Sequence, residues 1–187
     1  MISTVRIIEL MVFYILSLSV GYLFLFAIAS KFYRIRKYAQ AEKMNRFAVL
    51  FPAYKEDKVI IQSVTSFLEQ DYPKDKYEVI VISDHMEDAT NEALSQLPIR
   101  LIKATYTDSS KAKAMSLAMD VTEHEHYDMV VIMDADNLTT PQFLQEMNKA
   151  RNAGLKAIQA HRTAKNTNTD VALLDAVREE INNSLFR

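Results

Sequence analysis

Met129-Val130-Val131-Ile132-Met133-Asp134-Ala135-Asp136-Asn137 is a short apolar run that ends abruptly in two carboxylates. A run of this length predicts a buried strand, and in extended backbone the side chains of Asp134 and Asp136 leave it on the same side. Open α/β sheets bind their ligands at such strand ends. Two carboxylates there suit Mg²⁺ or Mn²⁺, which complete their shell with water and phosphate oxygens. The alternative is a plain acidic turn, because Asp favours turns through its own hydrogen bonds.

From Arg46 onward, short apolar runs alternate with segments of helical spacing, which is typical of an α/β domain with a mainly parallel sheet. Strands are expected at 47–51, ending at Pro52, and at 77–82, 99–103 and 129–133. Helices are expected at 58–69, 87–97 and 111–121. A further helix is expected to start at Thr140-Pro141 and to stop at Gly154, because Pro suits the first helical position and Gly the end. A fifth strand at 157–160 and a last helix from Asp170, still in progress at Arg187, complete the prediction.

The N-terminus contains an uncharged run from Leu10 to Ala29, long enough to cross a hydrocarbon core of about 30 Å at roughly 1.5 Å per residue. The run predicts a transmembrane helix. The alternative is a cleaved signal peptide, since Ala27-Ile28-Ala29 matches an A-x-A cleavage site. A set of basic residues follows the run: Lys31, Arg34, Arg36, Lys37, Lys43 and Arg46. By the positive-inside rule they predict a single-pass protein of the inner (plasma) membrane with its remaining chain in the cytoplasm. The segment 31–43 also carries aromatic residues and is expected to lie along an anionic leaflet.

Composition narrows the function. The 187 residues carry a formal net charge of -2, which gives no signature of nucleic-acid binding. No Cys is present, so disulfides and thiolate metal sites are excluded. With only Gly21 and Gly154, neither a P-loop nor a dinucleotide-binding glycine fingerprint can form. The expected organisation is an N-terminal segment with the membrane helix (1–30), a basic linker (31–45) and one globular domain (46–187).

Three of the expected strands end in polar residues that parallel strands bring to one edge, and these residues also carry a family resemblance. Phe51-Pro52-Ala53-Tyr54-Lys55-Glu56 resembles the P-A-Y-N-E opening of family 2 glycosyltransferases, with Lys55 at the Asn position. Ser83-Asp84-His85-Met86-Glu87-Asp88 resembles that family's D-D-G-S-T-D, with departures at the first Asp and at the Gly. Ser110-Lys111-Ala112-Lys113-Ala114 is similar to its G-K-A-x-A, and Asp134-Ala135-Asp136 with Pro141-Gln142-Phe143-Leu144 to its D-A-D-x-x-x-x-P-x-F-L. The resemblance covers roughly residues 47–187 in consistent order.

The resemblance implies a GT-A fold, C-terminally truncated here, a nucleotide-diphosphate sugar donor and inverting transfer to a cell-envelope saccharide or lipid-linked acceptor, with UDP-sugars favoured. It implies a donor site of Pro52, Ala53, Tyr54, Glu56, Asp84, Lys111, Asp134 and Asp136. Tyr54 and Glu56 would lie around the nucleoside, and Asp84 would meet the base edge. Asp134 would approach the ribose or the nearer phosphate, and Asp136, with Asp134, would hold Mg²⁺ or Mn²⁺. Lys111 would act as a point charge on a phosphate, the alternative being a solvated lysine.

Other residues carry weaker patterns. Asp88 is expected to be a helix N-terminal cap, and Glu123-His124-Glu125-His126 a solvated loop rather than a metal site. His85 is the histidine of interest, because it adjoins Asp84. Glu179-Glu180 is the only later acidic pair, and its helical setting does not predict the general base that inverting transfer needs.

The resemblance places that base beyond Arg187, so this chain alone is expected to bind nucleotide without transferring sugar. Two alternatives remain open: a membrane-tethered module that binds a nucleotide sugar without catalysis, and a nucleotidyltransferase. The second would want a glycine-rich loop after the first strand, which Ala53-Tyr54-Lys55 does not supply.

Overall fold

The structure is a computed structural model and describes residues 4–30, 32 and 37–185. These residues form two compact units: Tyr38–Ile158 is one, and Met1–Lys37 with Gln159–Arg187 is the other. The candidate donor residues all belong to the unit Tyr38–Ile158. The domain boundaries expected at residues 30 and 45 stay predictions.

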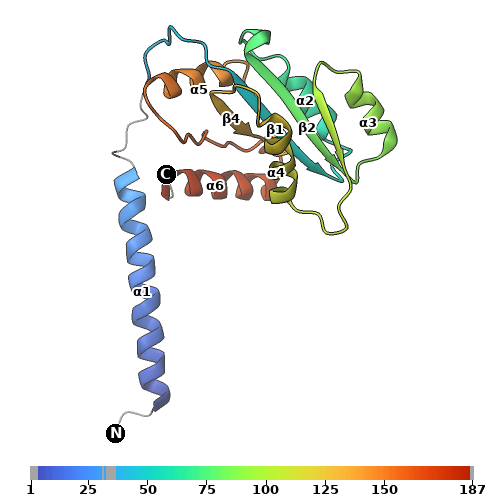
Figure 1. Cartoon of the computed structure of the whole chain (residues 1–187). Helices are drawn as coiled ribbons and strands as arrows, with labels where there is room; N and C mark the ends of the chain where they lie inside the picture. The colour runs from blue at the N-terminus through green and yellow to red at the C-terminus, as the bar shows by residue number, and fades with distance from the viewer. Residues whose placement is uncertain (1–3, 31, 33–36, 186–187) are drawn as a thin grey trace. The chain divides into compact units, whose positions relative to one another are not determined.

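The unit Tyr38–Ile158 is built on a parallel four-stranded sheet of order β3-β2-β1-β4 (Figure 1). The strands are β1 (Phe47–Tyr54), β2 (Tyr77–Asp84), β3 (Arg100–Ala104) and β4 (Met129–Ile132). The helices are α2 (Ile60–Phe67), the 3-10 turn η1 (Lys74–Lys76), α3 (Asp88–Ser95), α4 (Lys111–Thr122) and α5 (Phe143–Asn152). The expected α/β fold with a mainly parallel sheet is therefore confirmed. Strand order reverses between β1 and β4, which is where sheets of this kind place their ligands.

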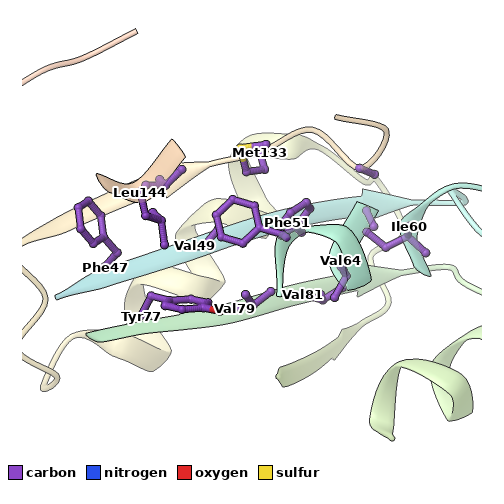
Figure 2. Close-up of a cluster of buried hydrophobic side chains, with 14 of the residues drawn as sticks. Phe47, Val49, Phe51, Ile60, Val64, Tyr77, Val79, Val81, Met133 and Leu144 are labelled. Atoms are coloured by element: carbon purple, nitrogen blue, oxygen red, sulfur yellow. The ribbon is translucent and has the colours of Figure 1, made fainter. Parts of the chain in front are cut away.

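Both faces of β1 are buried, and this explains its continuous apolar sequence. Phe47, Val49 and Phe51 point to one face, where they pack with side chains of α2 and α5 (Figure 2). Ala48 and Leu50 point to the other face, where they meet Ala114 and Ala118 of α4. The small side chains of α4 let that helix lie close to the sheet. The two layers of helices fix the strand ends at which the candidate site lies.

β1 continues past Pro52 to Tyr54, so the expected strand end at Pro52 is wrong. The Leu50 carbonyl accepts the Met133 N–H at 2.9 Å, so the backbone N–H and C=O of Leu50 point toward β4. These groups alternate sides along a strand, so those of Pro52, two residues further on, point the same way, but β4 ends opposite Leu50. The missing N–H of Pro52 therefore faces a side without a ladder partner, where proline is tolerated in a strand. β2 likewise continues to Asp84.

The segment after β4 is a turn rather than extended strand. The strand ends at Ile132, and the Asn137 N–H donates to the Asp134 carbonyl at 3.1 Å. The expectation that Asp134 and Asp136 leave an extended strand on one side is therefore wrong, and the backbone is the acidic turn that was the alternative. Both carboxylates nevertheless reach the same cleft, as described below.

The end of α5 is as expected, whereas its start is not. Gly154 has φ +93°, the Gly154 N–H donates to the Arg151 carbonyl (3.0 Å) and the Leu155 N–H to the Ala150 carbonyl (3.2 Å), which together make a Schellman motif. The helix begins at Phe143, because Pro141 lies in a preceding turn whose Thr140 carbonyl accepts the Phe143 N–H. The expected fifth strand at 157–160 is wrong: these residues are irregular and pair with none of the described strands.

Residues 43–45 are joined to the domain by hydrogen bonds and an ion pair. The Asn148 carboxamide oxygen on α5 accepts both the backbone N–H (3.0 Å) and the side-chain amide (2.7 Å) of Asn45. The Tyr72 hydroxyl donates to the Asn45 carbonyl at 2.8 Å, and burial raises the pKa of Tyr72 to about 12, which keeps it a neutral donor. Lys43 Nζ pairs with Asp128 at 3.0 Å. We call Lys43, Asn45, Asn148 and Tyr72 the anchor cluster.

The other unit contains α1 (Thr4–Ser30) and α6 (Asp170–Leu185). Residues 4–29 are long enough and apolar enough, with a mean hydropathy of 2.2, to span a membrane by length and composition. The Ser19 hydroxyl donates to the Ile15 carbonyl at 2.9 Å, so this polar group is satisfied within the helix. α6 starts as expected at Asp170, after Thr169, whose hydroxyl accepts the Ala172 N–H. Lys31, Arg34 and Arg36 of the expected basic segment lie outside the described residues.

Candidate functional site

A cleft of about 380 Å³ lies at the carboxyl edge of the sheet, where strand order reverses between β1 and β4. It is lined by the last residues of β1 and β2, by residues that follow β1 and β4, and by the start of α4 with the two residues before it: Pro52, Ala53, Tyr54, Glu56, Asp84, Ser109, Ser110, Lys111, Ala114, Asp134, Ala135 and Asp136. The structure therefore brings together all eight residues that the sequence assigns to donor binding. That they bind a donor stays a prediction.

One wall of the cleft is made by the ends of β1 and β2 and the loops that follow them. These two segments contact each other through a series of backbone and side-chain interactions. The Lys55 N–H donates to the Asp84 carbonyl at 3.2 Å, and the Glu56 N–H lies 3.1 Å from the Met86 sulfur. One step further along, Asp57 Oδ1 accepts the Glu87 N–H at 2.9 Å. These cross-loop contacts fix Tyr54 and Glu56 relative to Asp84.

Asp57 was not singled out by the sequence, yet it holds the start of α3. Besides the Glu87 N–H, it accepts a hydrogen bond from the Thr90 hydroxyl, which is the main reason that its pKa lies below the ordinary value. Asp88, the expected cap, is instead the first residue of α3, and the capping position belongs to Glu87. The expected role of Asp88 is therefore wrong, because a neighbouring loop supplies the carboxylate.

Asp84 is a buried carboxylate on the cleft wall, with its side chain 3% exposed. Burial alone would raise its pKa. Hydrogen bonds from the Ser109 hydroxyl, the His85 ring and the Tyr106 N–H outweigh burial and hold the pKa of Asp84 below the ordinary value. Asp84 is therefore ionised at neutral pH. An ionised carboxylate has about four acceptor positions, so three donors leave room for one more.

The opposite side of the cleft carries a cation beside a carboxylate. Lys111, in the first turn of α4, forms an ion pair with Asp134, and both side chains are about half exposed. The Ser110 hydroxyl caps α4 by accepting the Lys113 N–H at 3.2 Å. The positive end of the α4 dipole and the Lys111 ammonium therefore both lie at the cleft, an arrangement that favours a bound anion.

Asp136 is exposed at the cleft and makes no hydrogen bond or ion pair with the residues that the structure describes. No cluster of three or more His, Asp or Glu side chains able to hold a metal ion occurs within residues 4–30, 32 and 37–185. Mg²⁺ and Mn²⁺ commonly take only one or two protein carboxylates and complete their shell with phosphate oxygens and water. The oxygen donors of Asp134 and Asp136 therefore fit such an ion together with a diphosphate.

The remaining polar candidates serve the scaffold. Glu125 pairs with Arg100 at 2.5 Å, and hydrogen bonds from Arg100 and Tyr127 lower its pKa. Residues 123–126 form a turn and irregular backbone after α4, as the expected loop requires. His161 and Glu180 pair at 3.3 Å outside the cleft's unit. Ser109 is a cleft residue that the sequence analysis missed, although it directly precedes the Ser110-Lys111 motif.

Comparison with known proteins relates most of this chain to one family. The family model described as "Glycosyl transferase family 2" matches residues 48–182. Among curated relatives, a probable glycosyltransferase, YdaM, of Bacillus subtilis is 28% identical over 54% of this chain and 24% of its own length. The cellulose synthase catalytic subunit [UDP-forming] of Pseudomonas fluorescens is 32% identical over 57% of this chain and 14% of its own length.

A solved mannosyltransferase from Pyrobaculum calidifontis, in complex with GDP-Man and Mn²⁺, superimposes with a TM-score of 0.55 at 28% identity. The match covers 69% of this chain and 39% of that protein. The chain thus spans well under half the length of each of these relatives.

Proposed function

Because the chain belongs to glycosyl transferase family 2, we propose that its cleft binds a nucleotide-diphosphate sugar, UDP-linked by preference, as donor for inverting transfer. The observation that carries this proposal is the convergence of Tyr54, Asp84, Lys111, Asp134 and Asp136 on one cleft at the reversal of strand order. The acceptor would be a saccharide or lipid-linked group of the cell envelope. The name of the UDP-forming relative supports the preference for UDP.

The cleft offers a separate group for each part of such a donor. Asp84 has one acceptor position left, which suits an N–H on the edge of a nucleobase. The half-exposed ring of Tyr54 and the Glu56 carboxylate lie on the same wall, beside the expected nucleoside. The diphosphate would lie toward Lys111 and the N-terminus of α4, where the helix dipole and the ammonium both favour negative charge.

A divalent cation held by Asp136, with help from Asp134, would neutralise the charge that develops on the diphosphate leaving group. Asp134 is already paired with Lys111, so the protein's own cation keeps this carboxylate oriented toward the cleft. The complex of the Pyrobaculum mannosyltransferase with Mn²⁺ supports a divalent ion in this family. We propose Mg²⁺ or Mn²⁺ here.

Binding of UDP with and without Mn²⁺ tests this assignment. Mn²⁺ is expected to tighten UDP binding to the wild-type chain by about tenfold or more, or about 1.4 kcal/mol. Asp136→Asn should abolish that enhancement and leave the melting temperature unchanged, because Asp136 is exposed and makes no described contact. Asp120→Asn, which removes an exposed carboxylate of α4 outside the cleft, is the matched control. Equal Mn²⁺ enhancement in wild type and Asp136→Asn would refute the metal assignment.

Transfer itself needs a base that we assign to no described residue. Glu179 pairs with Arg162 (3.8 Å), and Glu180 with His161, outside the unit that contains the cleft. The expectation that this chain binds donor without transferring sugar stays a prediction. A labelled-donor assay with saccharide and lipid acceptors checks it, and sugar transfer by the 187-residue chain would contradict it. Donor binding without transfer is also what the alternative, a non-catalytic module, would show.

A further inference from the structure

Two residues directly beside the cleft lining have a backbone conformation that L-residues rarely adopt. Lys55 has φ 55° and His85 has φ 54°, and each directly follows the last residue of its strand, β1 or β2. They are the only described residues other than glycine with positive φ. Glycine adopts this region without steric cost, whereas a side chain at Cβ is crowded by its own backbone. His85 stands where the family motif has Gly, so its side chain is kept despite this cost.

The contacts of the His85 side chain suggest what it contributes. Its Nδ1 lies 2.6 Å from Asp84 Oδ1, and its ring meets the Tyr54 ring edge-on with centroids 5.7 Å apart. Both partners line the cleft, whereas His85 itself is not among the lining residues. The imidazole thus contacts the two groups expected to receive the nucleoside, although it does not itself line the cleft.

We propose that His85 is a positioning residue of the donor site: its imidazole orients the Asp84 carboxylate and the Tyr54 ring for the nucleobase. This inference rests on the proposed function. The ring donates from Nδ1 to one oxygen of Asp84, while the Ser109 hydroxyl and the Tyr106 N–H occupy further acceptor positions. The direction of the one acceptor position that remains on the Asp84 carboxylate is thereby fixed, because a carboxylate held by three donors cannot rotate freely. Tyr54, which is 49% exposed, gains a fixed edge contact that limits its rotation.

This role has a testable signature, because binding should fall while stability stays nearly unchanged. His85→Gly removes both the crowded Cβ and one hydrogen bond to Asp84, and these two effects on stability offset each other, so the melting temperature should change by no more than a few degrees. UDP affinity in the presence of Mn²⁺ should fall by about fivefold or more, since Asp84 and Tyr54 lose their orientation. A purely structural residue would lose both together.

His85→Asn is the matched variant. Asparagine tolerates positive φ better than other side chains and carries an amide N–H that can reach a neighbouring carboxylate. It should therefore recover most of the UDP affinity lost in His85→Gly by restoring the hydrogen bond to Asp84, with a remaining deficit because it lacks the ring that contacts Tyr54. Calorimetric titration of the full 187-residue chain with UDP and Mn²⁺, alongside thermal unfolding, measures both quantities.

The outcomes separate the two proposals. If the wild-type chain binds no UDP, the proposed function fails and this inference fails with it. If the wild type binds UDP and His85→Gly binds it equally well, only the positioning role is overturned. Weaker binding by His85→Gly with restored binding by His85→Asn supports the role.

Discussion

Asp84 shows how one residue couples the stability of the fold to the chemistry of the cleft. Its carboxylate is almost fully buried, and its donors Ser109, His85 and Tyr106 hold its pKa below the ordinary value of 3.8. A folded-state pKa below the unfolded one means that the ionised form stabilises the fold. This contribution is complete above about pH 4 and is lost as the pH falls through the folded-state pKa.

Asp84→Asn should therefore be less stable than the wild type at pH 7, by roughly 1–3 kcal/mol, because a buried charge-assisted acceptor is replaced by an amide. The difference should shrink below about pH 4, where Asp84 of the wild type becomes protonated first in the unfolded state and then, at lower pH, in the folded state. Urea unfolding of both proteins between pH 3 and pH 7, in steps of about half a pH unit, measures it. A difference that stays constant across this range would show that ionisation of Asp84 does not stabilise the fold.

At the residue scale, the sequence was informative for side chains whose type and place are enough, such as carboxylates at the end of an apolar run. Asp134, Asp136 and Asp84 stand at the ends of apolar runs, and that pattern placed them in one cleft correctly. The role of Asp57 could not be predicted, because it depends on a contact between two loops separated by about thirty residues. The contact of His85 with the Tyr54 ring depends on the same loops, whereas its contact with the adjacent Asp84 is local. Positive φ at His85 is equally hidden, since the sequence shows a histidine and not the conformation imposed by loop closure.

Among the elements, α3 depends on a carboxylate that lies outside it. Asp57 accepts the Glu87 N–H and the Thr90 hydroxyl, whereas the exposed Asp88 makes no capping bond. Asp57→Ala should cost about 1 kcal/mol of unfolding free energy, as removal of a helix cap does. Asp88→Ala, the matched control within the helix, should cost roughly a few tenths of a kcal/mol through the helix dipole alone.

Chemical denaturation of both variants measures the difference. Because Asp57 joins the loops that follow β1 and β2, its substitution should also weaken UDP binding, while the control should not. An equal loss of stability in the two variants would contradict the assignment of the helix cap to Asp57.

Element types were predictable here and element ends less so. The apolar runs identified all four strands, because burial on both faces leaves a continuous hydrophobic stretch. The end of β1 was placed too early, since whether Pro52 has a ladder partner depends on where β4 stops. The strand expected at 157–160 failed for the opposite reason: an apolar pattern was present, but no described strand edge pairs with it.

For the whole molecule, the membrane helix is the property most open to test. Residues 4–29 meet the length and composition of a membrane span, and so would an N-terminal signal sequence. If the basic flank is cytoplasmic and the chain is not cleaved, protease added to intact cells should spare the domain, and the mature N-terminus should be Met1 or Ile2. N-terminal sequencing and protease protection, with a permeabilised control, measure both. A mature protein starting at Ser30 would establish the signal-peptide alternative.

The basic flank also shows what the sequence alone could not resolve. Lys43 and Arg46 appeared as part of one cationic stretch beside the membrane. In the structure Lys43 pairs with Asp128, and the Arg46 guanidinium lies 4.5 Å from the centre of the Tyr127 ring. These two side chains therefore also make contacts within the domain, which their place in a basic stretch did not indicate.

The anchor cluster determines how a pull on the N-terminal part of the chain spreads through the domain. Tension arriving through residue 38 meets Lys43 and Asn45 first and passes into α5 through Asn148. The cleft lies at the other end of β1, where its lining begins at Pro52, about 17 Å beyond Phe47 at the rise of a strand. A displacement of residues before Tyr38 should therefore be taken up by α5 and the first residues of the sheet, before it affects the loops around Tyr54 and Asp84. The anchor cluster would in this way separate the cleft mechanically from movements of the N-terminal part of the chain.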